Sequence, residues 1–184
     1  ACGDTPGHGD AVATDRLLVG LGELPEAMER VLSQRESIGH AAAAYAPSRT
    51  YWAVVGNGPN RIAANEIRIK LSELAYKSIG CDATEDKKHI DLSAEPLIVV
   101  CAAGLSGPTA DDVAKEVAIF RAHKAAPIVI ASDGEDRFGA ALAVIPVPGV
   151  HPALAGQGVK CTAVDADLAK DWARADTWIR SSRF

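Results

Sequence analysis

A stripe of charged side chains in the first half of the chain could carry acid–base chemistry. Glu66, Lys70, Glu73 and Lys77 are separated by four, three and four residues, so on a helix they share one side. Such stripes are most often outer ladders of ion pairs. Our functional hypothesis is that Lys70 and Glu73 face a pocket at the ends of the strands. Glu73 would then move protons, and Lys70 would stabilise developing negative charge.

Two glycine-containing turns could supply the binding groups of such a pocket. One turn lies between an apolar run at 51–55 and a helical pattern at 59–79, and the other, 104–109, also follows an apolar run and opens a helix. Backbone N–H groups and hydroxyls at such positions can bind a phosphate or a sugar oxygen. A plain turn with a helix cap is an equally good interpretation of the second. The substrate-binding candidates are Gly56, Asn57, Gly58, Ser106, Gly107 and Thr109.

The first turn does not complete a dinucleotide-binding fingerprint. Its third glycine is missing, and the position for an acidic residue at the end of a second strand falls inside the predicted helix, so NAD is disfavoured. The four cysteines, at 2, 81, 101 and 161, stand far apart without metal-ligand spacing. We therefore expect reduced, structural thiols, and neither a cofactor nor a metal.

The elements that must position these residues follow an alternating order. Apolar runs rich in valine and isoleucine predict strands covered on both faces, which is typical of a parallel sheet. Pro25 is expected in the first turn of a helix, and Thr109 with Asp112 gives another helix a capping-box-like start. The fold class is therefore α/β, a three-layer αβα sandwich with a parallel, flavodoxin-like sheet. Strands are predicted at 51–55, 96–101, 127–131, 142–147 and, less clearly, 159–164, and helices at 22–45, 59–79, 110–124 and from 165 or 167 to 180.

Composition limits the classes of function. A chain of 184 residues with 48% apolar residues suits one domain with a sizeable core. A net charge of −5 and a pI near 5.5 argue against a nucleic-acid partner. The sequence shows neither a membrane-spanning run nor a secretory signal, so a cytoplasmic protein without membrane association is expected.

Together these features resemble the sugar isomerase (SIS) domain. The similarity is to the C-terminal isomerase half of the glutamine:fructose-6-phosphate amidotransferase family, also called glucosamine-6-phosphate synthase. It begins with LLVGLGELPEAMERVL at 17–32 and strengthens at VVGNG, 54–58, followed by ANEIRIKLSELAYKSIGCDATEDKKH, 64–89. The latter resembles the family's glycine turn, A-x-E-x-A-L-K-L-K-E-x-S-Y helix and E-L-K-H loop.

The resemblance implies a role for several residues. Lys70 and Glu73 match the family's K-L-K-E, here K-L-S-E, and His89 matches the histidine of L-K-H, with Ile90-Asp91 in place of glycine-proline. It implies that Glu73 shuttles a proton between C1 and C2 of a ketose phosphate while His89 assists ring opening. Lys170, in L-A-K at 168–170, would contact the sugar. The phosphate loop S-G-E-T-A-D is matched by S-G-P-T-A-D at 106–111.

The resemblance also implies the organisation of the protein. It covers the SIS domain at 16–150; composition predicts a flexible segment at 1–15, and helical spacing predicts a helix in the divergent tail at 151–184. The implied activity is that of a ketose–aldose isomerase or isomerising aminotransferase acting on fructose 6-phosphate and glucosamine 6-phosphate. A homodimer is implied, and a separate chain could supply the other SIS unit or the glutaminase. The alternative is a non-catalytic module that binds sugar phosphates or dimerises.

Overall fold

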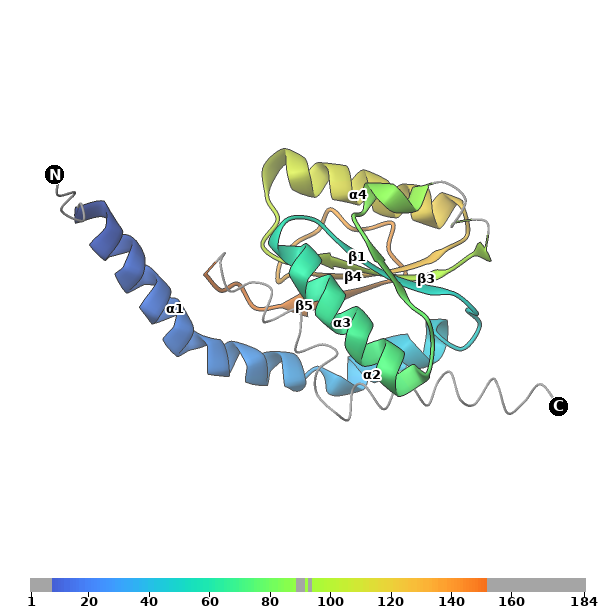
Figure 1. Cartoon of the computed structure of the whole chain (residues 1–184), viewed down its shortest axis with the longest axis horizontal. Helices are drawn as coiled ribbons and strands as arrows, with labels where there is room; N and C mark the ends of the chain where they lie inside the picture. The colour runs from blue at the N-terminus through green and yellow to red at the C-terminus, as the bar shows by residue number, and fades with distance from the viewer. Residues whose placement is uncertain (1–7, 89–91, 93, 152–184) are drawn as a thin grey trace, which may run out of the picture.

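A five-stranded parallel sheet lies at the centre of the computed structural model, which describes residues 8–88, 92 and 94–151 (Figure 1). The strand order is β2-β1-β3-β4-β5, and every neighbouring pair is parallel. This is the doubly wound order of flavodoxin-like sheets, so the predicted fold class is confirmed. The strands are β1 (Trp52–Gly56), β2 (Gly80–Asp82), β3 (Leu97–Ala102), β4 (Ala126–Ser132) and β5 (Ala143–Val147).

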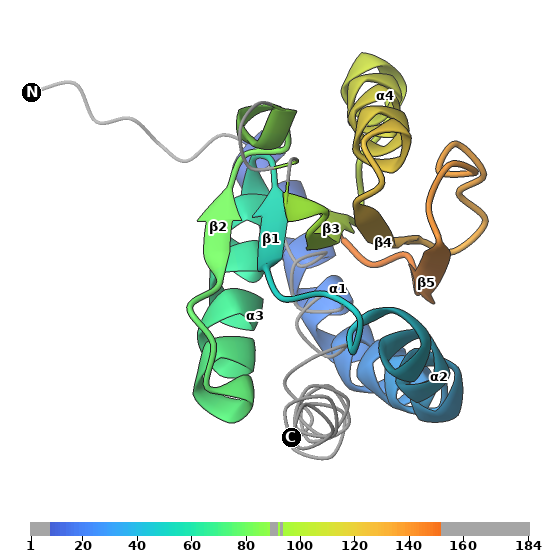
Figure 2. The ribbon, with the colours of Figure 1, turned by 90° about the vertical axis from the view of Figure 1, so that its right-hand side faces the viewer.

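Helices cover both faces of the sheet and make three layers. Helices α2 (Arg35–Tyr45) and α3 (Pro59–Ala75) pack on one face through buried side chains such as Ile38 and Ile67. Helix α4 (Gly107–Ala122) packs on the other face through Val113, Val117 and Phe120 (Figure 2). The residues of β3 and of β4 as far as Ala131 are buried, as the runs of valine and isoleucine predicted.

Helix α1 (His8–Leu32) begins within the segment 1–15 that the sequence predicted to be flexible. It projects away from the rest of the described structure (Figure 1). Pro25 lies inside it and not in its first turn, and the single helix predicted at 22–45 is broken after Leu32. At the break, Gln34 Nε2 donates to the carbonyl oxygen of Pro146 at 2.9 Å. The start of α2 is thereby held at the carboxyl end of β5.

Backbone conformations explain where two helix boundaries differ from prediction. Tyr76 has φ 51°, in the left-handed region, and ends α3 at Ala75 and not at 79. Ser106 is extended, with φ −148° and ψ 163°, and is the N-cap of α4, three residues before Thr109. The short strand β2 was not predicted, and its residues were assigned to a polar loop.

Arg49 links backbone segments at the amino edge of the sheet through hydrogen bonds. Its Nη1 donates to the carbonyl oxygens of Glu95 at 2.8 Å and Lys124 at 2.9 Å, just before β3 and β4. Lys77 Nζ donates to the carbonyl oxygen of Arg49 at 3.1 Å and lies 4.5 Å from the centroid of the Trp52 ring. The starts of β1, β3 and β4 are therefore joined.

Some sequence predictions fall outside the described residues. These are the strand at 159–164 and the helix ending at 180. Within the described part of the chain, none of the helices combines the length and the apolar character that crossing a membrane requires.

Candidate functional site

The loops that follow β1, β2, β3 and β4 meet at the carboxyl edge of the sheet. In the order β2-β1-β3-β4-β5, the chain leaves β1 toward one side and β3 toward the other, so a topological switch point lies between them. Ligands of open parallel sheets bind outside the strand ends at such a point. Both glycine turns singled out in the sequence lie here, as expected.

The turn after β1 is closely packed. A Cβ on Gly56 would lie 2.6 Å from the backbone oxygen of Asn60, so only glycine fits where the strand ends against the start of α3. Gly58 has φ +55°, which also favours glycine. The Asn60 side chain is 3% exposed and donates through Nδ2 to the carbonyl oxygen of Ala103 at 2.9 Å. This bond ties the start of α3 to the end of β3.

Asn57 joins the loops after β1 and β2. Its Nδ2 donates to Thr84 Oγ1 at 2.6 Å, and its Oδ1 accepts from the backbone N–H of Thr84 at 3.1 Å. Thr84 is buried. Because both ends of the amide are engaged, Asn57 holds the first turn in shape. The sequence analysis missed Asn60 and Thr84, and only the place of Asn60 in the first turn of a helix after a glycine turn could have indicated it.

The turn after β3 is open to solvent. Ser106, Gly107 and Thr109 are exposed, and the Ser106 side chain makes no capping hydrogen bond to α4. Gly104 and Gly107 have φ +72° and +54°. The Gly104 N–H donates to Ser132 Oγ at 2.8 Å, which joins the loops after β3 and β4. The first-turn N–H groups of α4 are therefore available to an anion.

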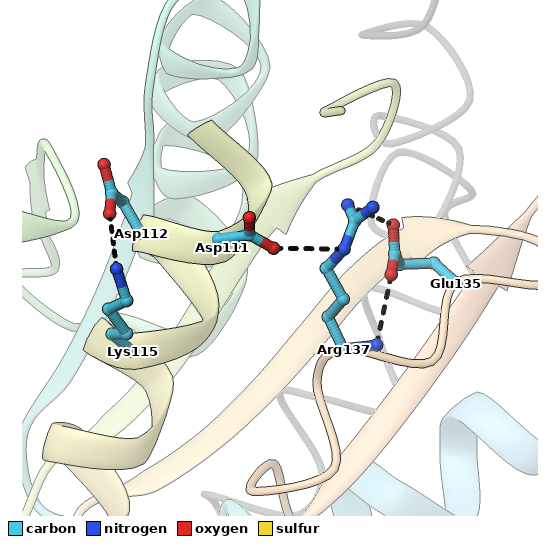
Figure 3. Close-up of polar contacts among 5 residues, drawn as sticks. All are labelled: Asp111, Asp112, Lys115, Glu135 and Arg137. Carbon is cyan, nitrogen blue, oxygen red and sulfur yellow. Dashed lines mark hydrogen bonds and ion pairs between the residues drawn. The ribbon is translucent and has the colours of Figure 1, made fainter. Parts of the chain in front are cut away.

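Charged side chains surround the first turns of α4 (Figure 3). Arg137 lies between Asp111 and Glu135, with Nε 3.3 Å from an Asp111 oxygen and Nη1 3.2 Å from a Glu135 oxygen. Glu135 also accepts from the backbone N–H of Arg137 at 3.1 Å. On the next side of the helix, Lys115 pairs with Asp112 at 3.0 Å. These contacts reduce the negative potential of the carboxylates near the turn.

Lys70 and Glu73 lie far along α3 from the glycine turn at the carboxyl edge. They form an ion pair of 3.5 Å on α3, with side chains 38% and 60% exposed. Helix α3 runs back from the glycine turn, so Glu73 lies about 21 Å along the axis from Pro59, toward the amino edge. The structure brings Gly56, Asn57 and Gly58 near the turn 104–109, but not this pair. Their catalytic role stays a prediction.

The other two catalytic candidates, His89 and Lys170, lie outside the described residues. Two positions before His89, Lys87 is buried and its Nζ lies 2.9 Å from Asp82 Oδ2. This ion pair fixes the loop that leads from β2 toward His89. The roles of His89 and Lys170 stay predictions.

The cysteines that the structure describes are free thiols, Cys81 and Cys101. Burial raises the pKa of Cys101 far above its ordinary value. Burial also raises the pKa of Cys81, although Arg61 and Arg68 oppose the shift. Neither thiol has the depressed pKa of a reactive nucleophile. Within the described ranges, His, Cys, Asp and Glu form no group of three that could hold a metal.

The sequence matches no family model and no curated protein. Solved structures do match. The C-terminal domain of glucosamine-fructose-6-phosphate aminotransferase from Francisella tularensis matches over 85% of this chain, with TM-score 0.68 and 16% identity. The sugar isomerase domain of the RpiR transcription factor from Sphaerobacter thermophilus matches over 92%, with TM-score 0.62 and 12% identity. The chain has the SIS fold.

Another protein with similar structure is the NanR protein of Vibrio vulnificus complexed with ManNAc-6P, which matches over 94% of this chain and 71% of that chain, with TM-score 0.64 and 10% identity. The chain spans 44% of the length of the Francisella C-terminal domain and 96% of that of the RpiR domain. At these identities the likeness shows the SIS fold and no particular activity.

Proposed function

We propose that this chain is a SIS domain that binds a sugar phosphate at the carboxyl edge of its sheet, with the phosphate at the turn 104–109. The observation that carries the proposal is the open N-terminus of α4, whose Ser106 side chain makes no capping bond. The turn lies at the switch point of the sheet. The NanR structure, which has a similar fold, is a complex with ManNAc-6P.

The chemistry of the turn fits a phosphate ester. The hydroxyls of Ser106 and Thr109 and the N–H of Gly107 can donate to phosphate oxygens, and the positive end of the α4 dipole favours their charge. Pro108 has no N–H to donate. Arg137 holds Asp111 and Glu135 in ion pairs, which limits their repulsion of an incoming anion. The turn therefore offers donors to a charged group in a partly neutralised environment.

We further propose that the sugar phosphate is converted by ketose–aldose isomerisation, as in glucosamine-6-phosphate synthases. Fructose 6-phosphate and glucosamine 6-phosphate are the proposed substrates. Glu73 would move a proton between C1 and C2, Lys70 would stabilise negative charge, His89 would assist ring opening, and Lys170 would contact the sugar. The protein would act in the cytoplasm, and a separate chain could supply ammonia.

The outward position of Lys70 and Glu73 adds a requirement to this mechanism. Because Glu73 is about 21 Å along α3 from the glycine turn, it could reach only a sugar held by another SIS unit or another subunit. A homodimer, or a complex with a chain carrying the other SIS unit, is therefore part of the proposal. Catalysis would then need that assembly, whereas phosphate binding at 104–109 would not.

The second candidate function is a non-catalytic module that binds a sugar phosphate. The exposed Lys70–Glu73 ion pair favours it, because such pairs are common on solvent-facing helix sides. A transcription factor among the similar structures shows that the fold also occurs outside enzymes. In this case ligand binding would change the oligomeric state of the protein, and the ligand would be released unchanged.

Thermal unfolding with fructose 6-phosphate, glucose 6-phosphate, glucosamine 6-phosphate and the unphosphorylated sugars tests binding. We expect stabilisation by the phosphate esters alone, weakened in Ser106→Ala and kept in the control Ser78→Ala, which changes an exposed serine near the end of α3. No stabilisation by any phosphate would refute the proposal. NMR of the sugars then separates the candidates, since turnover that Glu73→Gln abolishes indicates the enzyme, and binding without turnover indicates the module.

A further inference from the structure

Helix α1 carries an apolar stripe in which exposed and half-buried side chains alternate. Its members are separated by four, three and four residues, which is the spacing of a coiled-coil seam. Leu21 is 45% and Met28 36% exposed, and the neighbouring Leu18 is 60% exposed. The buried residues of the same helix, such as Ala27 and Val31, lie on an adjacent side. The stripe consists of Leu17, Leu21, Leu24 and Met28, of which Leu17 and Leu24 are half-buried.

The projecting part of α1 needs a partner to be stable as a helix. Figure 1 shows α1 extending beyond the sheet and its covering helices. Helix α1 has 25 residues, and most of the stability of helices in proteins comes from packing an apolar face and not from helix propensity. Leaving several large apolar side chains together in solvent is also uncommon for a protein surface. The stripe is therefore a candidate docking surface.

We propose that residues 165–180 of the same chain pack along this stripe. The segment carries Leu168, Trp172, Ala175 and Ile179, also separated by four, three and four residues. Two helices with this spacing can interlock their apolar side chains along a shared seam. The proposal does not depend on the function proposed above.

The path of the chain supports the segment as the occupant. His151 lines a recess of about 300 Å³ together with residues of α1, so the chain leaves the described structure beside this helix. The residues between 151 and 165 can span up to about 45 Å, well beyond the roughly 17 Å length of the stripe. A segment tethered this closely has a high effective concentration and outcompetes a second copy of the chain. The α1 residues of the recess are Asp15, Arg16, Val19, Gly20 and Glu23.

Hydrogen exchange of α1 in the full-length protein tests the proposal. Trp172→Asp is expected to speed exchange of the amides at 14–28 by about tenfold or more, because a charge in the seam releases the helix. Leu21→Asp should do the same, and the double variant should add little, since both break one contact. The controls are Thr177→Asp and Glu26→Ala, which lie on the opposite sides of the two seams at helical spacing and should leave exchange unchanged.

Two outcomes would overturn the proposal. One is that Trp172→Asp leaves α1 exchange as in the unmodified chain. The other is that the chain is a dimer by light scattering, that Leu21→Asp halves its mass, and that Trp172→Asp does not alter α1 exchange. The second result would assign the stripe to a second copy. An unchanged circular dichroism spectrum in every variant confirms that the sheet and its helices remain folded.

Discussion

The turns after β1 and β3 both join a strand to a helix through glycines, yet they are built differently. In the first, Asn57 and Asn60 bond to Thr84 and to the carbonyl of Ala103. In the second, Ser106 lies exposed and its side chain makes no cap. The first turn is closely packed at Gly56 and Asn60, whereas the second leaves backbone donors in solvent.

This difference suggests that the turn after β1 supports the fold and that the turn after β3 binds the ligand. Neither helix has a side-chain cap, and Asn60 Oδ1 in the first turn has no hydrogen-bond partner. What differs is that the first turn is tied to other loops by its asparagine side chains, whereas the second presents exposed hydroxyls beside its open helix N-terminus. We therefore expect substitutions in the first turn to change stability, and substitutions in the second to change affinity for a sugar phosphate. Four predictions test this contrast.

The largest effect is expected for Gly56→Ala. Its new Cβ would lie 2.6 Å from the backbone oxygen of Asn60, which cannot move without shifting α3. We expect a loss of about 3 kcal/mol or more in the free energy of unfolding, measured with urea. Gly107→Ala is the matched control, since its Cβ meets nothing within 4 Å and only the positive φ opposes it, at about 1 kcal/mol. Equal losses would contradict the contrast.

A smaller effect is expected for Asn60→Ala. The change removes a buried bond to the Ala103 carbonyl and leaves that oxygen without its donor, so stability should fall by about 2 kcal/mol. Asn65→Ala, on the exposed side of the same helix, should stay within about 0.5 kcal/mol. Chemical denaturation of both proteins measures the difference. If Asn65→Ala were the more harmful, Asn60 would not be the support inferred here.

The double substitution Ser106→Ala and Thr109→Ala tests the open turn. Stability should change by less than about 0.5 kcal/mol, because both side chains are exposed. The affinity for fructose 6-phosphate should fall about tenfold or more, since two bonds to a charged group are lost. Titration calorimetry measures the affinity. An unchanged dissociation constant would place the phosphate elsewhere.

The smallest effect on stability is expected for Lys70→Ala and Glu73→Gln. The ion pair is solvent-exposed, so each change should alter the free energy of unfolding by less than about 0.5 kcal/mol. A much larger loss would show that the pair is buried against another subunit in solution. Unfolding measured at several protein concentrations distinguishes the two cases.

Sequence patterns predicted most of the sheet because its central strands are buried on both faces. The runs at 96–101 and 127–131 became β3 and β4 within one residue at each end. Strand β2 was missed because it has three residues, lies at the edge and is only half-buried, so no apolar run marks it. The end of α3 was missed because Tyr76 takes a left-handed conformation that glycine usually takes.

The candidate site was predicted less completely than the fold. Glycine spacing located both turns, because few other residues fit such backbones. It could not show that Asn60 bonds to the Ala103 carbonyl or that Thr84 bonds to Asn57. Such partners lie far apart in the sequence and are brought together by the strand order. Periodicity placed Lys70 and Glu73 on one side of α3 but did not show whether that side faces solvent or a pocket. Their distance from the carboxyl edge follows from helix length alone, but the exposure of their side chains, 38% and 60%, required the structure.

The contacts of Arg49 have a mechanical consequence. One guanidinium nitrogen bridges the backbone segments that precede β3 and β4, and Lys77 ties the start of β1 to the same point. The amino ends of the three central strands, β1, β3 and β4, are thus held together at one point. If ligand entry spreads the sheet, the displacement must grow with distance from Arg49 and be greatest at the tips beside Gly58 and Ser106.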